Sequence, residues 1–200
     1  MVDTQNPFVN LDSSTVQVIQ NIKKRGVPVS DNTAQFIYET AIAESGTAKN
    51  PLTVKNPMTQ AAGIYQFIES KQNNSLSTAL NRISAKDNDG KYVYFDELPE
   101  WVNETKKHKD VTKLNKDQQT ALFLANLHQQ VGTDDLFKKI AEGDNQAKVD
   151  MYMKYHYKKD NKNVEDYAMS IFFPEKKSSN KGLSSLQAYN KILKYMKKGK

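Results

Sequence analysis

Residues 116–131 read KDQQTALFLANLHQQV, a run that is apolar around most of a helical circumference. Asn115 immediately precedes the run, and Gln118 lies three positions after Asn115. This is the spacing of a capping box at a helix N-terminus. Seven apolar residues then recur: Ala121, Leu122, Phe123, Leu124, Ala125, Leu127 and Val131. A helix that is hydrophobic on nearly every side must be enclosed by other elements. We therefore predict that 116–131 forms the central buried helix.

Shorter amphipathic stretches surround this helix in the sequence. Apolar residues at helical spacing, with capping residues before them and glycine or proline after them, predict further helices. These are expected at 15–25, 31–44, 64–71, 75–83, 101–106, 133–141, 146–158, 164–172 and 183–198. The Asp87-Asn88-Asp89-Gly90 turn lies between 82–85 and 92–95 and predicts a small β-hairpin. The expected fold class is mostly α, an all-helical domain with a small hairpin wing.

Length and composition limit the class of protein. Two hundred residues suffice for one domain with a substantial core. The chain has no cysteine, so it contains no disulfide framework, thiolate metal site or cysteine nucleophile. We recognise neither a basic-then-apolar leader at the N-terminus nor an apolar stretch of transmembrane length. The sequence is thus expected to be made in the cytoplasm without a signal peptide and to need other means of reaching a target outside it.

Positive charge is concentrated at the C-terminal end. The net charge is +6, and residues 175–200 hold eight lysines and one acidic residue. The remainder is nearly balanced, with 21 basic and 22 acidic residues. Such a segment is either a solvated end of the chain or a surface that attracts an anionic envelope, nucleic acid or acidic protein. We find no specific nucleic-acid site.

Two short motifs suggest chemistry. Glu44 closes the predicted helix 31–44 and is followed by Ser45 and Gly46, and 19 positions after Glu44 begins Gly63-Ile64-Tyr65-Gln66-Phe67. A Glu-Ser-Gly at a helix end, then a polar loop, then this glycine-glutamine stretch resembles the catalytic-glutamate and Gly-Leu-Met-Gln motifs of the lytic transglycosylases. These are lysozyme-like enzymes that cut peptidoglycan glycan strands. Ile64-Tyr65 stands where Leu-Met is common.

The resemblance extends downstream in phage-type members of the group. A glutamine-rich start to a Leu/Phe/Ala helix is found at 117–127, and a Tyr-x-x-His-like segment at 151–157. The resemblance implies a lysozyme-like catalytic domain over 30–174, after an arm and first helix over 1–29. A basic C-terminal helix over 175–200 is expected to pack on that domain.

What the resemblance implies for the site is residue-specific. Glu44 would be the single catalytic acid, and Tyr152 the tyrosine that contacts it. The substrate-binding set would comprise Ser45, Gly63, Tyr65, Gln66, Phe67, Tyr152 and His156. The substrate would be peptidoglycan, cleaved between N-acetylmuramic acid and N-acetylglucosamine, without a cofactor or metal. The expected context is a bacteriophage protein that opens the bacterial wall. It would either be carried in the virion for genome entry, with other virion proteins as partners, or be released as an endolysin.

Physical chemistry supports the choice of Glu44. Cleaving a glycosidic bond requires a proton on the leaving oxygen while C1 gains positive charge. The negative end of a helix dipole and apolar neighbours both favour the protonated form of a carboxyl group. Glu44 has the helix position, and Ile64, Tyr65 and Phe67 would supply the apolar neighbours if the two motifs meet.

Three alternatives stay open from the sequence. A hydrolytic lysozyme would need a placed water and usually a second acid, for which Glu69 and Asp96 are available. A virion protein could grip glycan without cutting it. A binder of nucleic acid or anionic membrane could act through the lysine-rich end. The three histidines, His108, His128 and His156, have no metal-ligand spacing.

Overall fold

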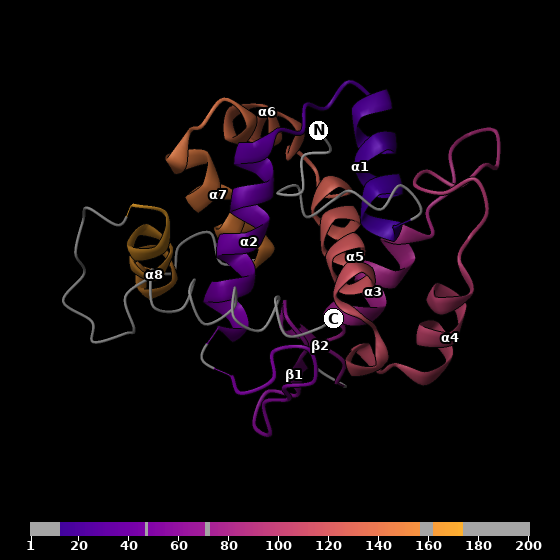
Figure 1. Cartoon of the computed structure of the whole chain (residues 1–200), viewed down its shortest axis with the longest axis horizontal. Helices are drawn as coiled ribbons and strands as arrows, with labels where there is room; N and C mark the ends of the chain where they lie inside the picture. The colour runs from indigo at the N-terminus through magenta and orange to yellow at the C-terminus, as the bar shows by residue number, and fades with distance from the viewer. Residues whose placement is uncertain (1–12, 47, 71–72, 157–161, 174–200) are drawn as a thin grey trace, which may run out of the picture.

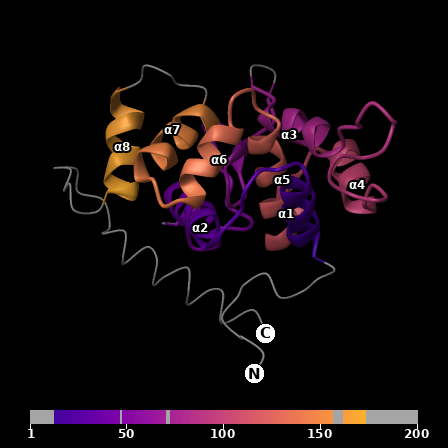
Figure 2. The same cartoon turned by 90° about the horizontal axis from the view of Figure 1, so that it is seen from above.

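The computed structural model describes residues 13–46, 48–70, 73–156 and 162–173. These residues form eight α-helices, one 3-10 helix and one two-stranded antiparallel sheet (Figures 1 and 2). The expected class, mostly α with a small β-hairpin, is thereby confirmed. The predicted N-terminal arm and the predicted helix at 183–198 lie outside the described residues. None of the described helices is both long and apolar enough to span a membrane.

The elements follow one another along the chain in a fixed order. They are α1 (Ser14–Lys24), α2 (Asp31–Ser45), β1 (Ala61–Ala62), β2 (Phe67–Ile68), α3 (Ser75–Ile83), α4 (Glu100–His108), η1 (Val111–Lys113), α5 (Lys116–His128), α6 (Asp134–Ala141), α7 (Asn145–Tyr155) and α8 (Lys162–Phe172).

The central helix is α5, as the sequence predicts. Asn115 Oδ1 accepts the Gln118 N–H at 2.9 Å, and Gln118 Oε1 accepts the Asn115 N–H at 3.0 Å, so the capping box is present. Every residue from Gln119 to Leu127 is buried. Val131 is an exception to the prediction, because it is 93% exposed. The helix stops earlier since the Thr133 hydroxyl donates to the carbonyls of Leu127 and Gln130.

Two groups of helices pack around one continuous apolar core. On one side, α1 and α3 pack on α5, and α4 packs on α3. On the other side, α7 packs between α6 and α8, and both of these contact α2. Figure 2 shows the α6–α8 group and the α1, α3 and α4 group on opposite sides of the molecule. α1 is joined to α5 through Asp117, whose carboxylate accepts the backbone N–H groups of Ser14 and Thr15.

The hairpin is present but lies at another place in the chain. β1 pairs with β2 around the turn 63–66, so the short helix expected at 64–71 is wrong. The turn predicted at 87–90 does form, since Gly90 N–H donates to Asp87 O at 3.0 Å. Its flanks carry only the single bridge between Lys86 and Tyr92. The strand expected at 82–85 fails because α3 continues to Ile83, which is fully buried together with Leu80.

Candidate active site

Glu44 occupies the last full turn of α2, one residue before the helix ends at Ser45. Its side chain is 8% exposed, so the carboxyl group is largely withdrawn from water. α2 forms here because Phe36, Ile37 and Ala41 are buried at helical spacing and Ser30 closes its N-terminus with a capping box. A helix end with a buried carboxyl group is the arrangement that the sequence predicts.

Two side chains hold this carboxyl group, one from the last turn of α7 and one from the residue that caps its C-terminus. The Tyr152 hydroxyl donates to Glu44 Oε1 at 2.5 Å, across 108 positions of sequence. His156 Nε2 lies 2.8 Å from the same oxygen. Tyr152 and His156 are four residues apart, so they share one face of the helix and reach Glu44 together. The structure thus brings together the glutamate and the two downstream residues of the predicted site.

The environment of Tyr152 keeps its hydroxyl group protonated. The side chain is 3% exposed and packs with its ring edge-on to Phe172, at 5.9 Å between centroids. Burial raises the pKa of Tyr152 well above its usual range, and the negative charge of Glu44 raises it further. Tyr152 is therefore a fixed hydrogen-bond donor to Glu44 rather than an acid.

The two oxygens of Glu44 have different surroundings. Oε1 is next to both Tyr152 and His156, whereas among the described residues Oε2 has no hydrogen-bond partner. With its proton on Nε2, His156 donates, and Oε1 then accepts two hydrogen bonds. A proton on Glu44 would consequently be carried by Oε2. The arrangement can therefore donate or accept a proton through one oxygen while the other keeps the carboxyl group oriented.

The glycine-glutamine stretch forms the turn between β1 and β2. Gly63 has φ +76°, and a Cβ atom there would lie 2.4 Å from Gln119 Oε1. That oxygen accepts the Ile64 N–H at 2.8 Å. Gln119 is fully buried in α5 and also donates to the carbonyls of Leu52, Val111 and Leu114. The close backbone approach that this glycine permits is therefore to Gln119, and the turn is bound to the central helix.

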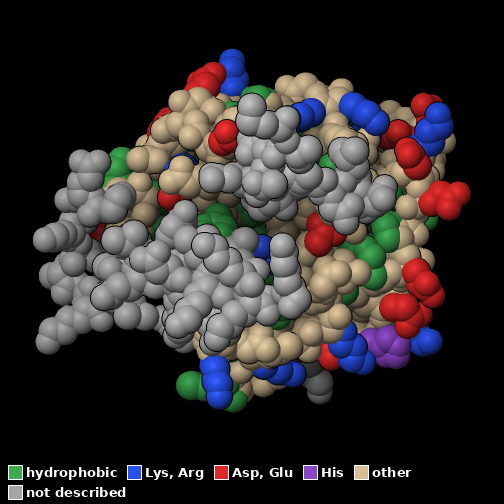
Figure 3. Space-filling view, in the orientation of Figure 1, with side chains coloured by type: hydrophobic (Ala, Val, Ile, Leu, Met, Phe, Trp, Pro, Cys, Tyr) green, Lys and Arg blue, Asp and Glu red, His purple; other side chains and the backbone are tan. Residues whose placement is uncertain are grey.

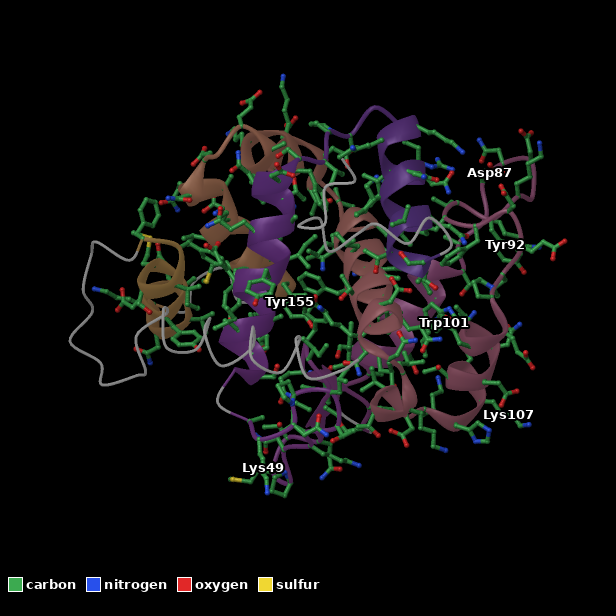
Figure 4. The ribbon with its side chains drawn as sticks, viewed as in Figure 1. Lys49, Asp87, Tyr92, Trp101, Lys107 and Tyr155 are labelled. Atoms are coloured by element: carbon green, nitrogen blue, oxygen red, sulfur yellow. The ribbon has the colours of Figure 1, made fainter. Side chains whose placement is uncertain are left out.

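The same turn is connected to the Glu44 cluster through α7. The Tyr155 hydroxyl donates to the Tyr65 carbonyl oxygen at 2.5 Å. The Tyr155 ring packs edge-on against Phe123 of α5 and next to His156. Figure 4 labels Tyr155 near the centre of the molecule. The last turn of α7 thus contacts both predicted motifs, Glu44 through Tyr152 and His156, and the turn through Tyr155.

The remaining predicted substrate-binding residues fall into two groups. Ser45, Tyr65 and Phe67 have buried side chains: Ser45 Oγ donates to Ala41 O, Tyr65 stacks on Phe123 at 4.1 Å, and Phe67 is 1% exposed. Gln66 is partly exposed, and its Nε2 donates to Gly63 O at 2.8 Å. His156 keeps 29% of its side-chain surface accessible. Gln66 and His156 are therefore the two whose side chains are accessible to a ligand.

Glu69 and Asp96, the two candidates for a second acid, lie in surroundings different from that of Glu44. Glu69 accepts the backbone N–H and the hydroxyl of Ser77 in the first turn of α3, so it acts as a helix cap. Asp96 lies exposed in the loop before α4. In the described part of the structure, neither of them is hydrogen-bonded to Glu44. In the described part of the chain there is also no group of three or more His, Asp or Glu residues placed to bind a metal ion.

Two contributors to the site have no distinctive sequence signal. Lys148 of α7 pairs with Glu39 of α2 at 3.1 Å, with the lysine side chain only 5% exposed. Tyr167 of α8 donates its hydroxyl to Ala43 O at 2.9 Å, next to Glu44. Helical periodicity predicts α7 and α8, but neither residue type nor spacing indicates which helix each of them faces. Only the packing of α7 and α8 on α2 reveals these contacts.

Comparisons with protein-family models, with curated proteins and with solved structures find no match to this chain.

Proposed function

We propose that this protein is a peptidoglycan lytic transglycosylase that cleaves the β-1,4 bond between N-acetylmuramic acid and N-acetylglucosamine, with Glu44 as its single catalytic acid and base. The observation that supports the proposal is the contact of Tyr152 and His156 with one oxygen of a nearly buried glutamate. The Glu-Ser-Gly and glycine-glutamine motifs resemble those of this enzyme class, and both are joined to the last turn of α7.

In the proposed reaction, Glu44 gives its proton from Oε2 to the glycosidic oxygen as the bond to C1 breaks. The N-acetylglucosamine fragment leaves as an alcohol. The resulting carboxylate is stabilised by the hydrogen bonds from Tyr152 and His156. It then takes the proton of the muramic C6 hydroxyl as that oxygen attacks C1, which closes a 1,6-anhydro ring. Glu44 ends the cycle protonated, and no water or metal is consumed.

The experiment is mass analysis of the soluble fragments released from purified sacculi by the full-length protein. Anhydro ends, one water lighter than hydrolysed ends, are expected. The Glu44→Gln variant should lose about a hundredfold to ten-thousandfold in rate, the range of a positioned general acid. Glu97→Gln, an exposed residue in the loop before α4, is the matched control and should retain the activity. Wild-type protein that binds sacculi and releases no fragments would leave only the non-catalytic glycan-binding alternative.

The position of His156 favours one second candidate, a hydrolytic muramidase using the same glutamate. A partly exposed imidazole 2.8 Å from Glu44 could accept a proton from water after the first step. The same mass analysis separates the two reactions, because hydrolysis leaves reducing ends that carry the added water. Reducing ends that disappear in a His156→Phe variant while anhydro ends persist would assign the water step to this histidine.

The proposal also places the protein in a bacteriophage, located in the virion with or without partner proteins. The motifs that resemble the phage-type enzymes support it. An antibody to the protein, applied to purified particles and to late-infection lysate, would separate a virion enzyme from an endolysin.

A further inference from the structure

Among the described residues, Tyr167 of α8 is a half-exposed aromatic side chain beside the Glu44 cluster, and the proposed reaction has no use for it. It is 47% exposed, whereas its neighbour Tyr152 is 3% exposed. The two rings are 6.4 Å apart between centroids and inclined by 58°. Tyr167 thus extends the aromatic packing around Glu44 out to the protein surface.

The ring of Tyr167 is held in place beside the reacting group. Its hydroxyl donates to the carbonyl oxygen of Ala43, the residue before Glu44, at 2.9 Å. Burial raises the pKa of Tyr167, and the negative charge of Glu44 raises it further. An exposed ring with a fixed hydroxyl loses little conformational freedom when a ligand binds to it.

A chain of aromatic side chains runs from this ring into the core. Tyr167 neighbours Tyr152, Tyr152 neighbours His156 at 4.5 Å, and His156 neighbours Tyr155 at 5.2 Å. Two accessible members, Tyr167 on α8 and His156 at the end of α7, adjoin Glu44. An apolar surface with a few polar groups beside a proton donor suits a ligand that has both hydroxyl groups and apolar C–H faces.

We infer that Tyr167 is a sugar-binding platform, on which a pyranose ring of the glycan next to the scissile bond stacks its C–H face. The inference rests on the proposed function, since it names a contact of the same site with the same substrate class. The alternative role for Tyr167 is a purely structural one, in which its hydroxyl fastens α8 to the end of α2. The two roles depend on different parts of the side chain, the ring and the hydroxyl.

Two substitutions separate these parts. Tyr167→Phe keeps the ring and removes the hydroxyl, whereas Tyr167→Leu removes both and leaves an apolar side chain. The matched control is Tyr92→Leu, a partly exposed tyrosine beside Lys86 on the opposite edge of the molecule from α8 (Figure 4). Each variant is combined with Glu44→Gln in the full chain, so that binding is measured without cleavage. The probe is the linear tetramer of N-acetylglucosamine, and affinity is measured by calorimetry.

The platform predicts that Tyr167→Phe and Tyr92→Leu bind the tetramer as the parent does, while Tyr167→Leu binds about tenfold more weakly. Equal weakening by Tyr167→Phe and Tyr167→Leu would overturn the inference in favour of the structural role. Unchanged binding by Tyr167→Leu would overturn it as well. If Tyr167→Leu does not fold, proton NMR of the Glu44→Gln protein decides: stacking shifts sugar ring protons upfield with cross-peaks to Tyr167, and their absence refutes the platform.

Failure of this inference and failure of the proposed function give different results. If the wild-type protein releases anhydro fragments and Tyr167→Leu has the same KM, the sugar-binding platform is refuted and the enzymatic function stands. If the wild-type protein releases no fragment, the proposed enzymatic function is refuted. The tetramer titration then still reports whether Tyr167 contacts sugar.

Discussion

Among the described residues, the hydroxyl group of Tyr152 has one hydrogen-bond partner, Glu44 Oε1, so removing this hydroxyl tests how the carboxyl group is oriented. Tyr152→Phe preserves the buried ring and its contact with Phe172 but removes the donor. A hydrogen bond to a charged group contributes about 1.5–3 kcal/mol, so kcat should fall about tenfold to a hundredfold. KM should change little, because the hydroxyl is turned away from solvent. Rates of fragment release at saturating and at low sacculus concentrations give the two constants.

Tyr155→Phe is the matched control for this substitution. It removes a hydroxyl from the same helix turn, but that hydroxyl donates to Tyr65 O and not to Glu44. A kcat for Tyr152→Phe equal to that of Tyr155→Phe would show that the bond to Glu44 does not orient the acid.

His128 is a second residue with a defined electrostatic role, here in stability. Its Nδ1 lies 2.7 Å from the Tyr94 hydroxyl at the end of α5. Burial lowers the pKa of His128, Arg25 lowers it too, and Asp134 partly opposes them. Below about pH 6.5, the ordinary histidine pKa, the unfolded chain therefore binds a proton that the folded protein resists. The free energy of unfolding therefore has its full contribution from neutral His128 above that pH, and this contribution is lost as the pH falls below it.

His128→Gln should consequently make the free energy of unfolding less dependent on pH between about 7 and 5. Urea unfolding at several pH values measures the slope for wild type and variant. His108→Gln is the control, since that histidine is 48% exposed and its ion pair with Glu104 lies at the surface. Parallel stability curves for wild type and His128→Gln would contradict the assignment.

Between the elements α2 and α7, a partly buried ion pair fixes how the two helices lie along each other. Lys148 Nζ is 3.1 Å from Glu39 Oε2, and Gln35 donates to the other oxygen of Glu39 at 2.8 Å. Lys148 precedes Tyr152 by one turn on the same face of α7, and Glu39 precedes Glu44 on α2. The pair therefore sets the register in which Tyr152 meets Glu44.

Lys148→Met removes the charge and keeps most of the volume, leaving Glu39 without its cation. Breaking a fully buried pair costs about 3–5 kcal/mol; since Glu39 is 21% exposed, we expect a smaller loss of about 1–3 kcal/mol. The double variant Lys148→Met with Glu39→Gln should regain most of that stability, because no unpaired charge remains. Urea unfolding compares the three proteins. Equal destabilisation in the single and double variants would show that packing, not charge, is lost.

The elements also show what the sequence can and cannot predict. The capping box of Asn115 and Gln118 and the apolar run behind it are local signals, and α5 follows them. The strong turn residues at 87–90 predict a hairpin over 82–95, yet the two strands form within 61–68, where Gly63 and Gln66 both take positive φ. That choice depends on Gln119, 55 positions away, which binds the Ile64 N–H and which no local pattern reveals.

For the site, the sequence predicts individual residues better than their environments. Glu44 and Tyr152 are indicated by motif and resemblance, and the structure places them in contact. The resemblance predicts that Tyr65 and Phe67 contact substrate, but their rings are buried against α5 and its neighbours. An aromatic residue next to a motif fits a core and a binding surface equally well, so burial has to be observed. Tyr167 and Lys148 require knowledge of helix packing for the same reason.

At the scale of the whole molecule, the charge is unevenly distributed along the chain. Eight of the 29 basic residues fall within 175–200, a segment outside the described residues. Within the described surface, acidic side chains gather along the edge that carries α4 and the loop before it (Figure 3). Asp96, Glu97, Glu100 and Glu104 are exposed there. An anionic wall would be repelled by this edge and attracted by the lysine-rich segment.

This asymmetry predicts how binding to sacculi depends on salt. In the full-length protein, replacing Lys191, Lys194, Lys197 and Lys198 by glutamine should weaken co-sedimentation at low salt and flatten its decline as salt rises, since exposed charges are screened beyond about 10 Å at 0.1 M. The control replaces four exposed lysines elsewhere, Lys91, Lys107, Lys113 and Lys139. Both variants change the net charge equally, so a larger effect of the first set assigns the attraction to the C-terminal segment. Equal effects would attribute it to overall charge, and cleavage of soluble glycan fragments should persist in both because Glu44 and its partners are untouched.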